Sequence, residues 1–325
     1  MRAKKEMPHE IQPLSDSMPS GFHGNERATT WKLPRQVLDF THRPAIMGIV
    51  NVTPDSFSDG GEFLDVDRAV DHALGLVNDG ADILDIGGES TRPGAAEVSA
   101  RDELARVLPV IERLVARTSV PLSIDTSKAM VARAAIEAGA RILNDVTGLE
   151  GDPEMLGVAQ ASDVGICAMH MRGNPRTMQL DPRYDDVVEA TWTYLRQRRE
   201  ALDAVGIESE RVCLDPGIGF GKTHAHTLEM LRHVDRYLAL QRPILIGHSR
   251  KGFLAKLIGD PARDRTAATV GVALACAARG IQILRVHDVA PLRDALIAFD
   301  ASGGRGGELA REVADECLGT EEKHR

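Results

Sequence analysis

The stretch VPLSIDTSKAMVARAAIEAGARILNDV, residues 120–146, contains the pattern that decides the fold. A short apolar run at 120–125 is followed by a helical pattern at 130–138 and by a second apolar run at 141–146. Both runs are too continuously apolar to leave one strand face in water, which is typical of parallel strands buried on both faces. The stretch therefore predicts a strand–helix–strand unit.

The same alternation extends in both directions along the chain. We expect eight strands, at residues 45–52, 83–87, 120–125, 141–146, 165–170, 211–215, 243–247 and 281–286. Helical patterns lie between them, for example at 67–78, 102–116, 130–138, 185–204, 267–278 and 290–298. Eight strand-then-helix units over about 250 residues predict an α/β protein, a single-domain (β/α)8 TIM barrel. A doubly wound open sheet is the competing architecture.

The ends of the chain lack this pattern. Residues 1–30 mix Pro, Gly, Ser, His and charge without periodicity, which predicts a disordered N-terminal arm. Residues 303–325 are Gly-rich and then acidic, and we expect a loose C-terminal tail. The barrel is therefore expected to occupy residues 31–302.

Composition narrows the class of protein. A net charge of −9 argues against a nucleic-acid partner, which would need a basic face. No apolar run approaches the roughly 20 residues of a membrane span, and no apolar stretch follows the basic start as in a secretory signal. Cys167, Cys213 and Cys276 lie inside apolar segments and are interpreted as reduced core residues. We therefore expect a cytoplasmic enzyme that acts on small molecules.

Polar residues stand at the ends of the predicted strands. Seven of the eight runs finish in, or lead into, Asn51, Glu89, Asp125, Asn144 with Asp145, His170, Asp215 and His287. The remaining run, 243–247, leads to Ser249, Arg250 and Lys251. A buried charge is costly unless it is paired or used. A ring of such residues at one end of a barrel predicts the floor of an active site.

A glycine-rich turn, GIGFGKT at residues 217–223, follows the strand at 211–215. The Walker phosphate-binding pattern needs Gly five places before Gly221, where this chain has Pro216, which argues against a nucleotide hydrolase. We interpret the turn as one that lets the backbone approach a flat ligand, with Phe220 offering an aromatic face. An ordinary strand-to-helix turn is the alternative.

Other motifs indicate anion binding. The loop GGESTRPG at 87–94 is flanked by glycines and carries Arg92, which suits a lid that closes over a substrate. Arg285 interrupts an apolar strand, so it needs an anionic partner, and phosphates commonly bind after the last two strands of such barrels. Asn51 fits a structural amide as well as an oxygen ligand for Mg²⁺. His170 fits a core histidine as well as a site residue, and we interpret the histidines at 223–226 and the charged helix faces as solvated.

Together these segments resemble dihydropteroate synthases over about residues 31–301. The matching segments are MGIVNVTPDSF (47–57), ESTRPG (89–94), IDT (124–126), ND (144–145), MHM (169–171), DPG (215–217), SRK (249–251) and RVHD (285–288). The resemblance implies the joining of 6-hydroxymethyl-7,8-dihydropterin pyrophosphate to para-aminobenzoate, with release of pyrophosphate. It also implies Mg²⁺ and a homodimer.

The resemblance further implies a role for each matching residue. The pterin would contact Thr91, Asp125, Asn144, Met169, Asp215, Gly219 and Lys251. The pyrophosphate would contact Asn51, Thr91, Arg92, Arg285 and His287, with Asn51 also binding Mg²⁺. The slot for para-aminobenzoate would consist of Pro93, Phe220, Ser249 and Lys251. The catalytic group would be Asp59, Arg92 and Lys251.

The mechanism implied by the resemblance is dissociative. Pyrophosphate leaves first, a cation forms at the methylene carbon of the pterin with Asp59 facing it, and the aniline nitrogen then attacks. No protein nucleophile is needed, which fits the absence of a Ser–His–Asp or Cys–His arrangement. We also expect inhibition by sulfonamides, which mimic para-aminobenzoate.

Two other functions stay open at this stage. A pterin-dependent methyltransferase shares the barrel and the Asp–Asn–Asp floor, but it would not need the pyrophosphate-binding residues or the STRPG loop. A catalytically silent pterin-binding paralogue would not need Asp59, Arg92, Lys251 and Arg285, which are all present.

Overall fold

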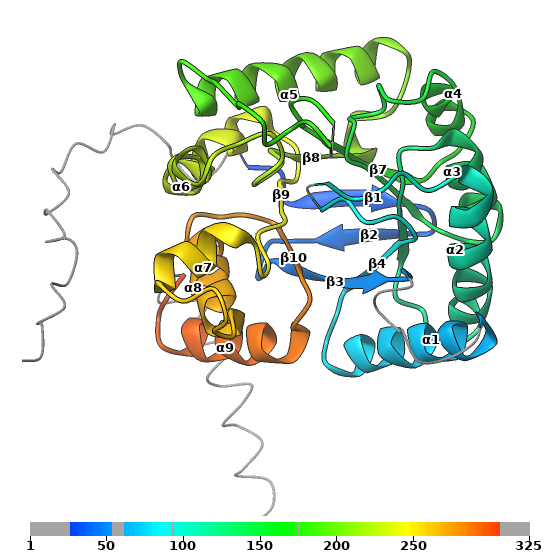
Figure 1. Ribbon diagram of the computed structural model, residues 1–325, viewed down its shortest axis with the longest axis horizontal. Coiled ribbons are helices and arrows are strands. Elements are labelled where there is room, and N and C mark those ends of the chain that lie inside the picture. Colours follow the sequence, from blue (N-terminus) through cyan, green and yellow to red (C-terminus); the bar gives the residue numbers. More distant parts are fainter. Residues whose placement is uncertain (1–26, 54–61, 93, 175, 306–325) are drawn as a thin grey trace, which may run out of the picture.

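A computed structural model describes residues 27–53, 62–92, 94–174 and 176–305 (Figure 1). The strands are β1 (Thr30–Leu33), β2 (Gln36–Asp39), β3 (Ala45–Asn51), β4 (Ile83–Gly87), β5 (Leu122–Asp125), β6 (Ile142–Asp145), β7 (Gly165–Met169), β8 (Val212–Asp215), β9 (Leu245–Ile246) and β10 (Ile283–Val286). The α-helices are α1 (Glu62–Asn78), α2 (Ala100–Val115), α3 (Ala129–Glu137), α4 (Met155–Gln160), α5 (Val187–Ala204), α6 (His224–Arg232), α7 (Gly252–Ile258), α8 (Thr266–Ala278) and α9 (Val289–Ala301). Two 3₁₀ helices are η2 (Ser209–Arg211) and η3 (Val234–Leu240).

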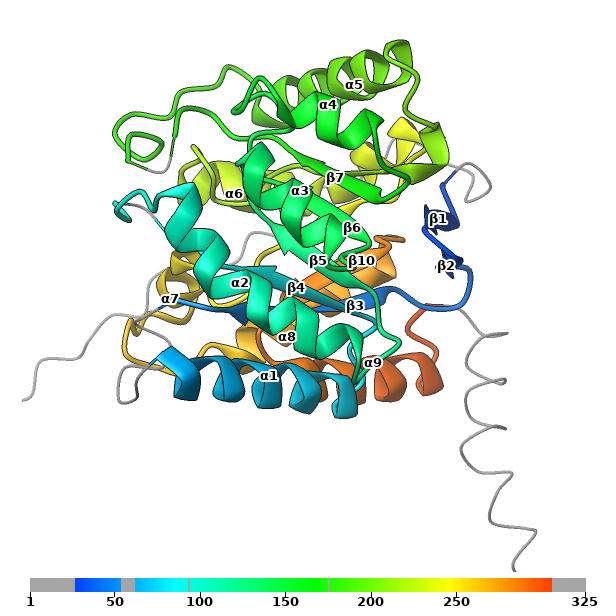
Figure 2. The same cartoon turned by 90° about the vertical axis from the view of Figure 1, so that its right-hand side faces the viewer.

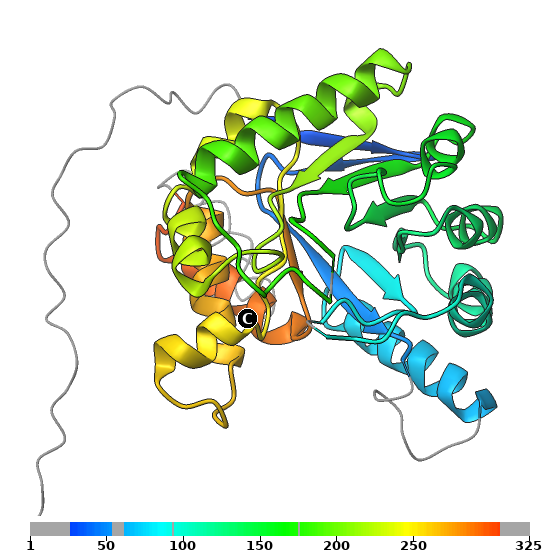
Figure 3. The ribbon, with the colours of Figure 1, turned by 45° about the horizontal axis from the view of Figure 1, so that its top comes forward.

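The strands β3 to β10 form one parallel sheet that curls into a barrel. The order is β8-β7-β6-β5-β4-β3-β10-β9, so the first barrel strand lies beside the last. A parallel bridge between Leu214 and Ile244 joins the two edges, and the Leu214 amide donates to the Pro243 carbonyl over 2.9 Å. The helices lie outside the ring of strands (Figure 3). The predicted TIM barrel is confirmed, and the alternative of an open doubly wound sheet is wrong.

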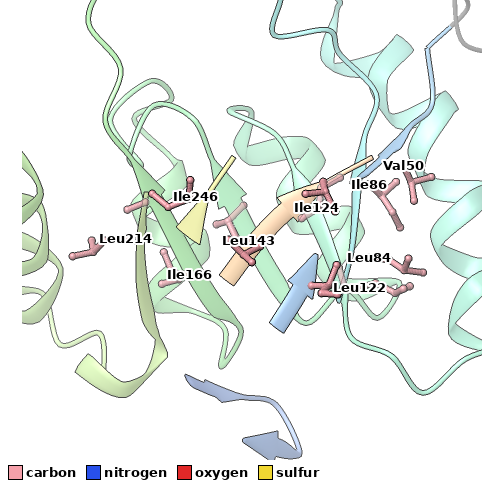
Figure 4. Close-up of a cluster of buried hydrophobic side chains, with 14 of the residues drawn as sticks. Val50, Leu84, Ile86, Leu122, Ile124, Leu143, Ile166, Leu214 and Ile246 are labelled. Atoms are coloured by element: carbon pink, nitrogen blue, oxygen red, sulfur yellow. The ribbon is translucent and has the colours of Figure 1, made fainter. Parts of the chain in front are cut away.

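Each barrel strand sends alternate side chains to opposite faces, as strand geometry requires. One set is buried between the strands and the helices and includes Val50, Leu84, Ile86, Leu122, Ile124, Leu143, Ile166, Leu214 and Ile246 (Figure 4). The other apolar set faces the barrel interior and includes Met47, Ile83, Ile142, Cys167, Cys213, Leu245 and Ile283. Burial on both faces explains why the strands are continuously apolar in sequence.

A hairpin that the sequence analysis did not predict covers the amino-terminal end of the barrel. Its strands β1 and β2 pair antiparallel, and it lies opposite the loops that follow the barrel strands (Figure 2). Trp31 and Phe40 are buried in the interior cluster, and the Trp31 indole donates to the Arg211 carbonyl over 2.8 Å. A Cβ on Gly165 would stand 2.3 Å from Leu33, so the hairpin packs directly on the start of β7. The hairpin therefore closes one end of the barrel and leaves the other for ligands.

The predicted ends of the domain stay predictions, because most of residues 1–30 and 303–325 lie outside the described residues. Within the described part, Arg27 donates to the Gly280 carbonyl over 3.2 Å.

Cys167, Cys213 and Cys276 are free and buried, as predicted. No helix among the described residues is long and apolar enough to cross a membrane.

One local expectation is confirmed for His224, which is exposed, but not for His226. Thr223 and His226 form a capping box at the start of α6, with the His226 amide donating to Thr223 Oγ1 over 3.0 Å. His226 is half-buried, so it is not a solvated surface histidine. A capping box satisfies two backbone amides that have no partner inside the helix, which explains why α6 begins here.

Candidate active site

Polar side chains form the upper layer of the barrel interior, at the carboxyl ends of the strands. They come from β4, β5, β6, β8 and β10, and they are Asp85, Asp125, Asn144, Asp215 and Arg285. Four of the five follow, two residues along the strand, a side chain of the interior apolar set, which forms the lower layer. Asp125 instead follows Ser123, which is polar and buried. Because all strands are parallel, these side chains meet at the same end of the barrel.

Arg285 holds this layer together. Its Nε donates to Asp85 Oδ2 over 2.6 Å, and its Nη2 donates to Asp125 Oδ2 over 2.7 Å. Asn144 Nδ2 donates to the same Asp85 oxygen over 3.1 Å. The anionic partner that Arg285 needs is therefore supplied by two carboxylates of the protein. Its guanidinium side chain is about one fifth exposed, so one edge can still reach a ligand.

Asp85 is a site residue that the sequence analysis missed. Its side chain is completely buried, and Oδ1 has no hydrogen-bond partner among the described residues. The signal was present, because a carboxylate inside the apolar run at 83–87 is as anomalous as Arg285 in its own strand. The two anomalies explain each other as an ion pair across the barrel.

Burial changes the pKa values of the charged side chains at the carboxyl ends of the strands, which form the charged floor of the site. Burial and the neighbouring Asp85 carboxylate raise the pKa of Asp125 to about 7, against the opposing effect of Arg285. Burial also raises the pKa of Asp215, whose Oδ1 accepts from the Gly217 amide over 2.7 Å. Burial lowers the pKa of Lys251 to about 8, although Asp215 favours its charged form. Groups with pKa values near neutrality are typical of functional sites.

Lys251 lies between the floor and the glycine-rich turn. Its Nζ donates to the Ile218 carbonyl and lies 4.3 Å from the centroid of the Phe220 ring. A Cβ on Gly219, which has a φ of 83°, would come within 3.3 Å of the Lys251 stem. The structure thus brings together three predicted residues, Lys251, Phe220 and Gly219, around one ammonium group.

A second group of predicted residues lies beyond the last two strands. Ser249 Oγ and His287 Nδ1 are 2.9 Å apart, and the His287 amide donates to the same hydroxyl over 3.2 Å. Burial lowers the pKa of His287 to about 4, with smaller effects from Arg285, Arg250 and Arg92. His287 is therefore neutral at pH 7 and stands near several cations. This side of the barrel suits an anion.

The loop after β4 carries Thr91 and Arg92, of which Arg92 is exposed. A cavity of about 770 Å³ opens there beside Asp125, and Thr91 is among its lining residues. Lys128 Nζ lies 2.5 Å from both a Glu89 and a Glu103 carboxylate oxygen.

Glu103 is completely buried, so the expectation that the charged faces of the helices are solvated is wrong for this residue. Glu89 also accepts from the Val98 amide over 2.9 Å, which ties the two ends of the loop together. The ion pairs therefore anchor the base of the predicted lid.

The remaining predicted residues divide into two cases. Met169 ends β7 and is buried, and Asn51 ends β3 and is half-buried. No contact joins Asn51 to the other predicted residues among the hydrogen bonds of the described part of the chain. Asp59 and Pro93 lie outside the described residues.

Comparisons with known proteins agree with this geometry. A family model described as a pterin binding enzyme matches residues 47–287, which contain the whole charged floor. The barrel and its floor thus define a pterin-binding enzyme of the TIM-barrel class.

The chain is 48% identical over 267 residues to dihydropteroate synthase of Neisseria meningitidis serogroup C, covering 80% of this chain and 93% of the relative. It is 43% identical over 265 residues to dihydropteroate synthase of Escherichia coli K12, covering 82% and 93%. The chain belongs to the dihydropteroate synthase family.

Solved structures give the same result. A Xanthomonas albilineans dihydropteroate synthase with 4-aminobenzoic acid aligns with a TM-score of 0.79 at 46% identity, covering 85% of this chain and 98% of that one. The same enzyme in complex with 7,8-dihydropteroate aligns with a TM-score of 0.76 at 43% identity, covering 84% and 98%. A Yersinia pestis dihydropteroate synthase in a sulfonamide complex aligns with a TM-score of 0.79 at 42% identity, covering 84% and 98%.

Proposed function

We propose that this chain joins 6-hydroxymethyl-7,8-dihydropterin pyrophosphate to para-aminobenzoate, forming 7,8-dihydropteroate and pyrophosphate. The observation that carries the proposal is the buried network in which Arg285 bridges Asp85 and Asp125 while Asn144 binds Asp85. The polar groups of this network lie at the carboxyl ends of the strands and are largely shielded from water. Hydrogen bonds between such groups and a ligand are strong, because the local dielectric constant is low.

The floor suits the edge of a pterin ring. That edge presents amide and amino N–H groups, which need carboxylate acceptors, and a carbonyl oxygen, which needs a donor. Asp125 and Asp215 supply the acceptors, Asn144 supplies an amide, and Lys251 supplies the donor. Met169, which is buried beside them on β7, offers an apolar contact to the ring. Gly219 lets the backbone come close.

The reaction begins with cleavage of the bond between the methylene carbon and the pyrophosphate oxygen. The electron pair leaves with pyrophosphate, and a positive charge is delocalised into the dihydropterin. Arg285, with Arg92, Thr91 and His287, would bind the leaving group through charge-assisted and neutral hydrogen bonds. Asp59 would face the positive charge. Preorganised charges of this kind typically supply a large share of the catalytic effect.

The second step forms the carbon–nitrogen bond. The aniline nitrogen of para-aminobenzoate attacks the methylene carbon and then loses a proton to solvent. Phe220, Ser249, Pro93 and the stem of Lys251 would form the slot that holds the aniline ring. No covalent intermediate with the protein is required.

The donor set at Asn51 fits Mg²⁺. This ion keeps several waters and is often bound through one or two protein oxygens together with substrate phosphates. No cluster of three or more His, Cys, Asp or Glu side chains suited to a metal occurs in the described ranges, so the protein would supply few ligands itself. We propose that Asn51 contributes its amide oxygen and pyrophosphate the others. When bound, Mg²⁺ would neutralise charge on the leaving group.

We also propose that the enzyme works as a homodimer in the cytoplasm. The dimer follows from the family resemblance and is testable by light scattering on the purified protein. The three free buried cysteines support a reducing compartment. Sulfonamides should compete with para-aminobenzoate, and turnover that persists undiminished at saturating sulfonamide would contradict this.

The test of the main proposal is direct. Purified protein, dihydropterin pyrophosphate, labelled para-aminobenzoate and Mg²⁺ should give labelled dihydropteroate and pyrophosphate in equal amounts. Binding of dihydropterin pyrophosphate without product would favour a silent pterin-binding paralogue. Methyl transfer from methyltetrahydrofolate, with no dihydropteroate, would favour a pterin-dependent methyltransferase.

A further inference from the structure

Lys222 is a completely buried lysine to which the proposed reaction assigns no role. It lies in the glycine-rich turn at 217–223 after β8 and is only 1% exposed. A lysine ammonium loses its hydration when it is buried, and burial accordingly lowers the pKa of Lys222 well below its ordinary value. A residue that is this costly to bury needs strong local partners.

Three acceptors surround the Lys222 ammonium nitrogen. Nζ lies 2.9 Å from His170 Nδ1, 3.3 Å from the His170 carbonyl oxygen and 2.9 Å from the Phe220 carbonyl oxygen. A protonated lysine has three N–H bonds, which matches the number of these contacts. The lysine therefore joins the end of β7, where His170 lies, to the turn that follows β8.

The backbone of the turn also packs closely against the loop after β7. A Cβ on Gly217 would stand 1.9 Å from the His170 carbonyl oxygen, and one on Gly221 would stand 2.4 Å from the Arg172 carbonyl oxygen. Both glycines have positive φ values, 69° and 64°. Two of the three glycines in this turn are thus required by contact with the loop after β7.

The turn held in this way carries the groups that meet Lys251. The carbonyl of Ile218 accepts from Lys251 Nζ, and the ring of Phe220 lies over the same nitrogen. Lys222 Nζ donates to the carbonyl of Phe220 over 2.9 Å. A shift of this carbonyl would move the ring of Phe220 with it. Of the pterin floor, Asp215 touches this turn, because its Oδ1 accepts from the Gly217 amide. Asp85, Asp125 and Asn144 are instead held by Arg285 and by one another, and their hydrogen bonds do not involve the turn.

We propose that Lys222 is a positioning residue that fixes the turn 217–221 through His170 and the Phe220 carbonyl, and so sets the affinity for para-aminobenzoate. The proposal rests on the proposed function, because it assigns the slot beside Phe220 to that substrate. It assigns no contact between Lys222 and either substrate.

The first variant is Lys222→Met, which keeps the length of the side chain and removes its N–H groups. Loss of the hydrogen bonds from Lys222 Nζ should raise KM for para-aminobenzoate by about tenfold. KM for dihydropterin pyrophosphate should rise by less than about threefold, since Asp85, Asp125 and Asn144 are held by Arg285 and not by the turn. An unchanged KM for para-aminobenzoate, or an equal rise in both KM values, would overturn the proposal.

A matched pair at His170 covers the case in which Lys222→Met does not fold. His170→Asn keeps an acceptor close to the position of Nδ1, and His170→Leu removes it. Both lose the edge contact between His170 and Tyr194, whose ring centroids are 4.9 Å apart, so packing is controlled. His170→Leu should raise KM for para-aminobenzoate several-fold more than His170→Asn. Equal KM values in the two variants would contradict the role of the lysine–histidine bond.

Wild-type turnover separates failure of this inference from failure of the proposed function. If the wild type forms no dihydropteroate, the proposed function itself fails and the role given to Lys222 fails with it. If the wild type turns over and the variants keep its ratio of KM values, only the role of Lys222 is wrong.

Discussion

The lower and upper layers of the barrel interior stand on the same strands, yet they differ in chemistry. Ile83 and Asp85 are two residues apart on β4, and Ile283 and Arg285 are two residues apart on β10. The lower residue of each pair joins an apolar cluster sealed by Trp31, and the upper residues form an ion pair. Position along the strand decides whether an inward side chain stabilises the barrel or serves the ligand.

The two layers also differ in what they contribute to stability. Burying the lower layer stabilises the fold by about 25 cal/mol for each Å² of apolar surface removed from water. The upper layer buries charges whose loss of hydration is offset only while every partner is present. Changes in the upper layer should therefore affect activity strongly, and changes in the lower layer should affect stability alone.

The largest effect is expected from Arg285→Ala. It removes the cation between Asp85 and Asp125 and should lower kcat/KM by about a thousandfold, since a charged contact to the leaving group is lost. It should also reduce the free energy of unfolding by about 3–5 kcal/mol, because two buried carboxylates lose their partner. Assays and urea unfolding measure both.

The control for Arg285→Ala is Arg196→Ala. Arg196 forms an exposed ion pair with Glu200 within α5, and such pairs contribute little to stability. Wild-type kcat/KM in Arg285→Ala would contradict the claim that the upper layer serves the ligand.

A smaller effect is expected from Asp85→Asn, which keeps the shape of the side chain and removes its charge. Because Arg285 keeps Asp125 as a partner, kcat/KM should fall by about 10–100-fold rather than a thousandfold. The Asp85 carboxylate raises the pKa of Asp125, so the variant should titrate Asp125 at lower pH. A pH profile that does not move towards acid would show that the two carboxylates do not interact.

The pH dependence of the wild type should have two limbs. Asp125 must be ionised to accept from the pterin, so kcat/KM should rise as the pH passes about 7. Lys251 must be protonated to donate, so kcat/KM should fall as the pH passes about 8. In Lys251→Arg the residual activity should lack the alkaline limb, because guanidinium does not titrate there. A profile of kcat/KM that is flat between about pH 6 and about pH 9, a range that spans both pKa values, would contradict these assignments.

The raised pKa of Asp125 also affects stability. Between the ordinary pKa of 3.8 and about 7, the folded state binds the Asp125 proton more strongly than the unfolded state. The contribution of this group to the free energy of unfolding is therefore largest at low pH and is lost as the pH rises through that window. Asp125→Asn should remove this contribution. Urea unfolding at about pH 5 and about pH 8, which lie below and above the pKa of Asp125 in the folded state, would measure the change.

The smallest effect on activity is expected from Trp31→Phe in the lower layer. The variant loses the hydrogen bond to the Arg211 carbonyl and part of the packing, which should cost about 1–3 kcal/mol of unfolding free energy. KM and kcat should stay unchanged, because the hairpin lies at the opposite end of the barrel. Altered KM values would show that the two layers are mechanically linked.

Much of this fold could be predicted from the sequence, and the exceptions have physical reasons. Barrel strands buried on both faces leave continuous apolar runs, so all eight were found. The hairpin was missed because β2 has no buried face, with Val37 largely exposed, although Trp31 and Leu33 in β1 are buried. Its role depends on contacts with β7 and β8, which are remote in sequence.

The site was predictable where a polar residue ends a strand and less so elsewhere. Asp125, Asn144 and Asp215 end their strands, and the sequence marked them. Asp85 lies inside its strand. Its buried charge is explained only by the ion pair with Arg285, which is 200 residues away in the sequence. The role of Lys222 depends on His170, which is 52 residues away, and no local pattern reveals that contact.

The central claim is that the upper layer binds the pterin, and one titration tests it most directly. Calorimetry would compare the binding of dihydropterin pyrophosphate to the wild type and to Asp125→Asn, each with Mg²⁺ present. The account predicts that Asp125→Asn binds about 100-fold more weakly, because a carboxylate that accepts from the ring becomes an amide. Equal affinity in the two proteins would contradict the account.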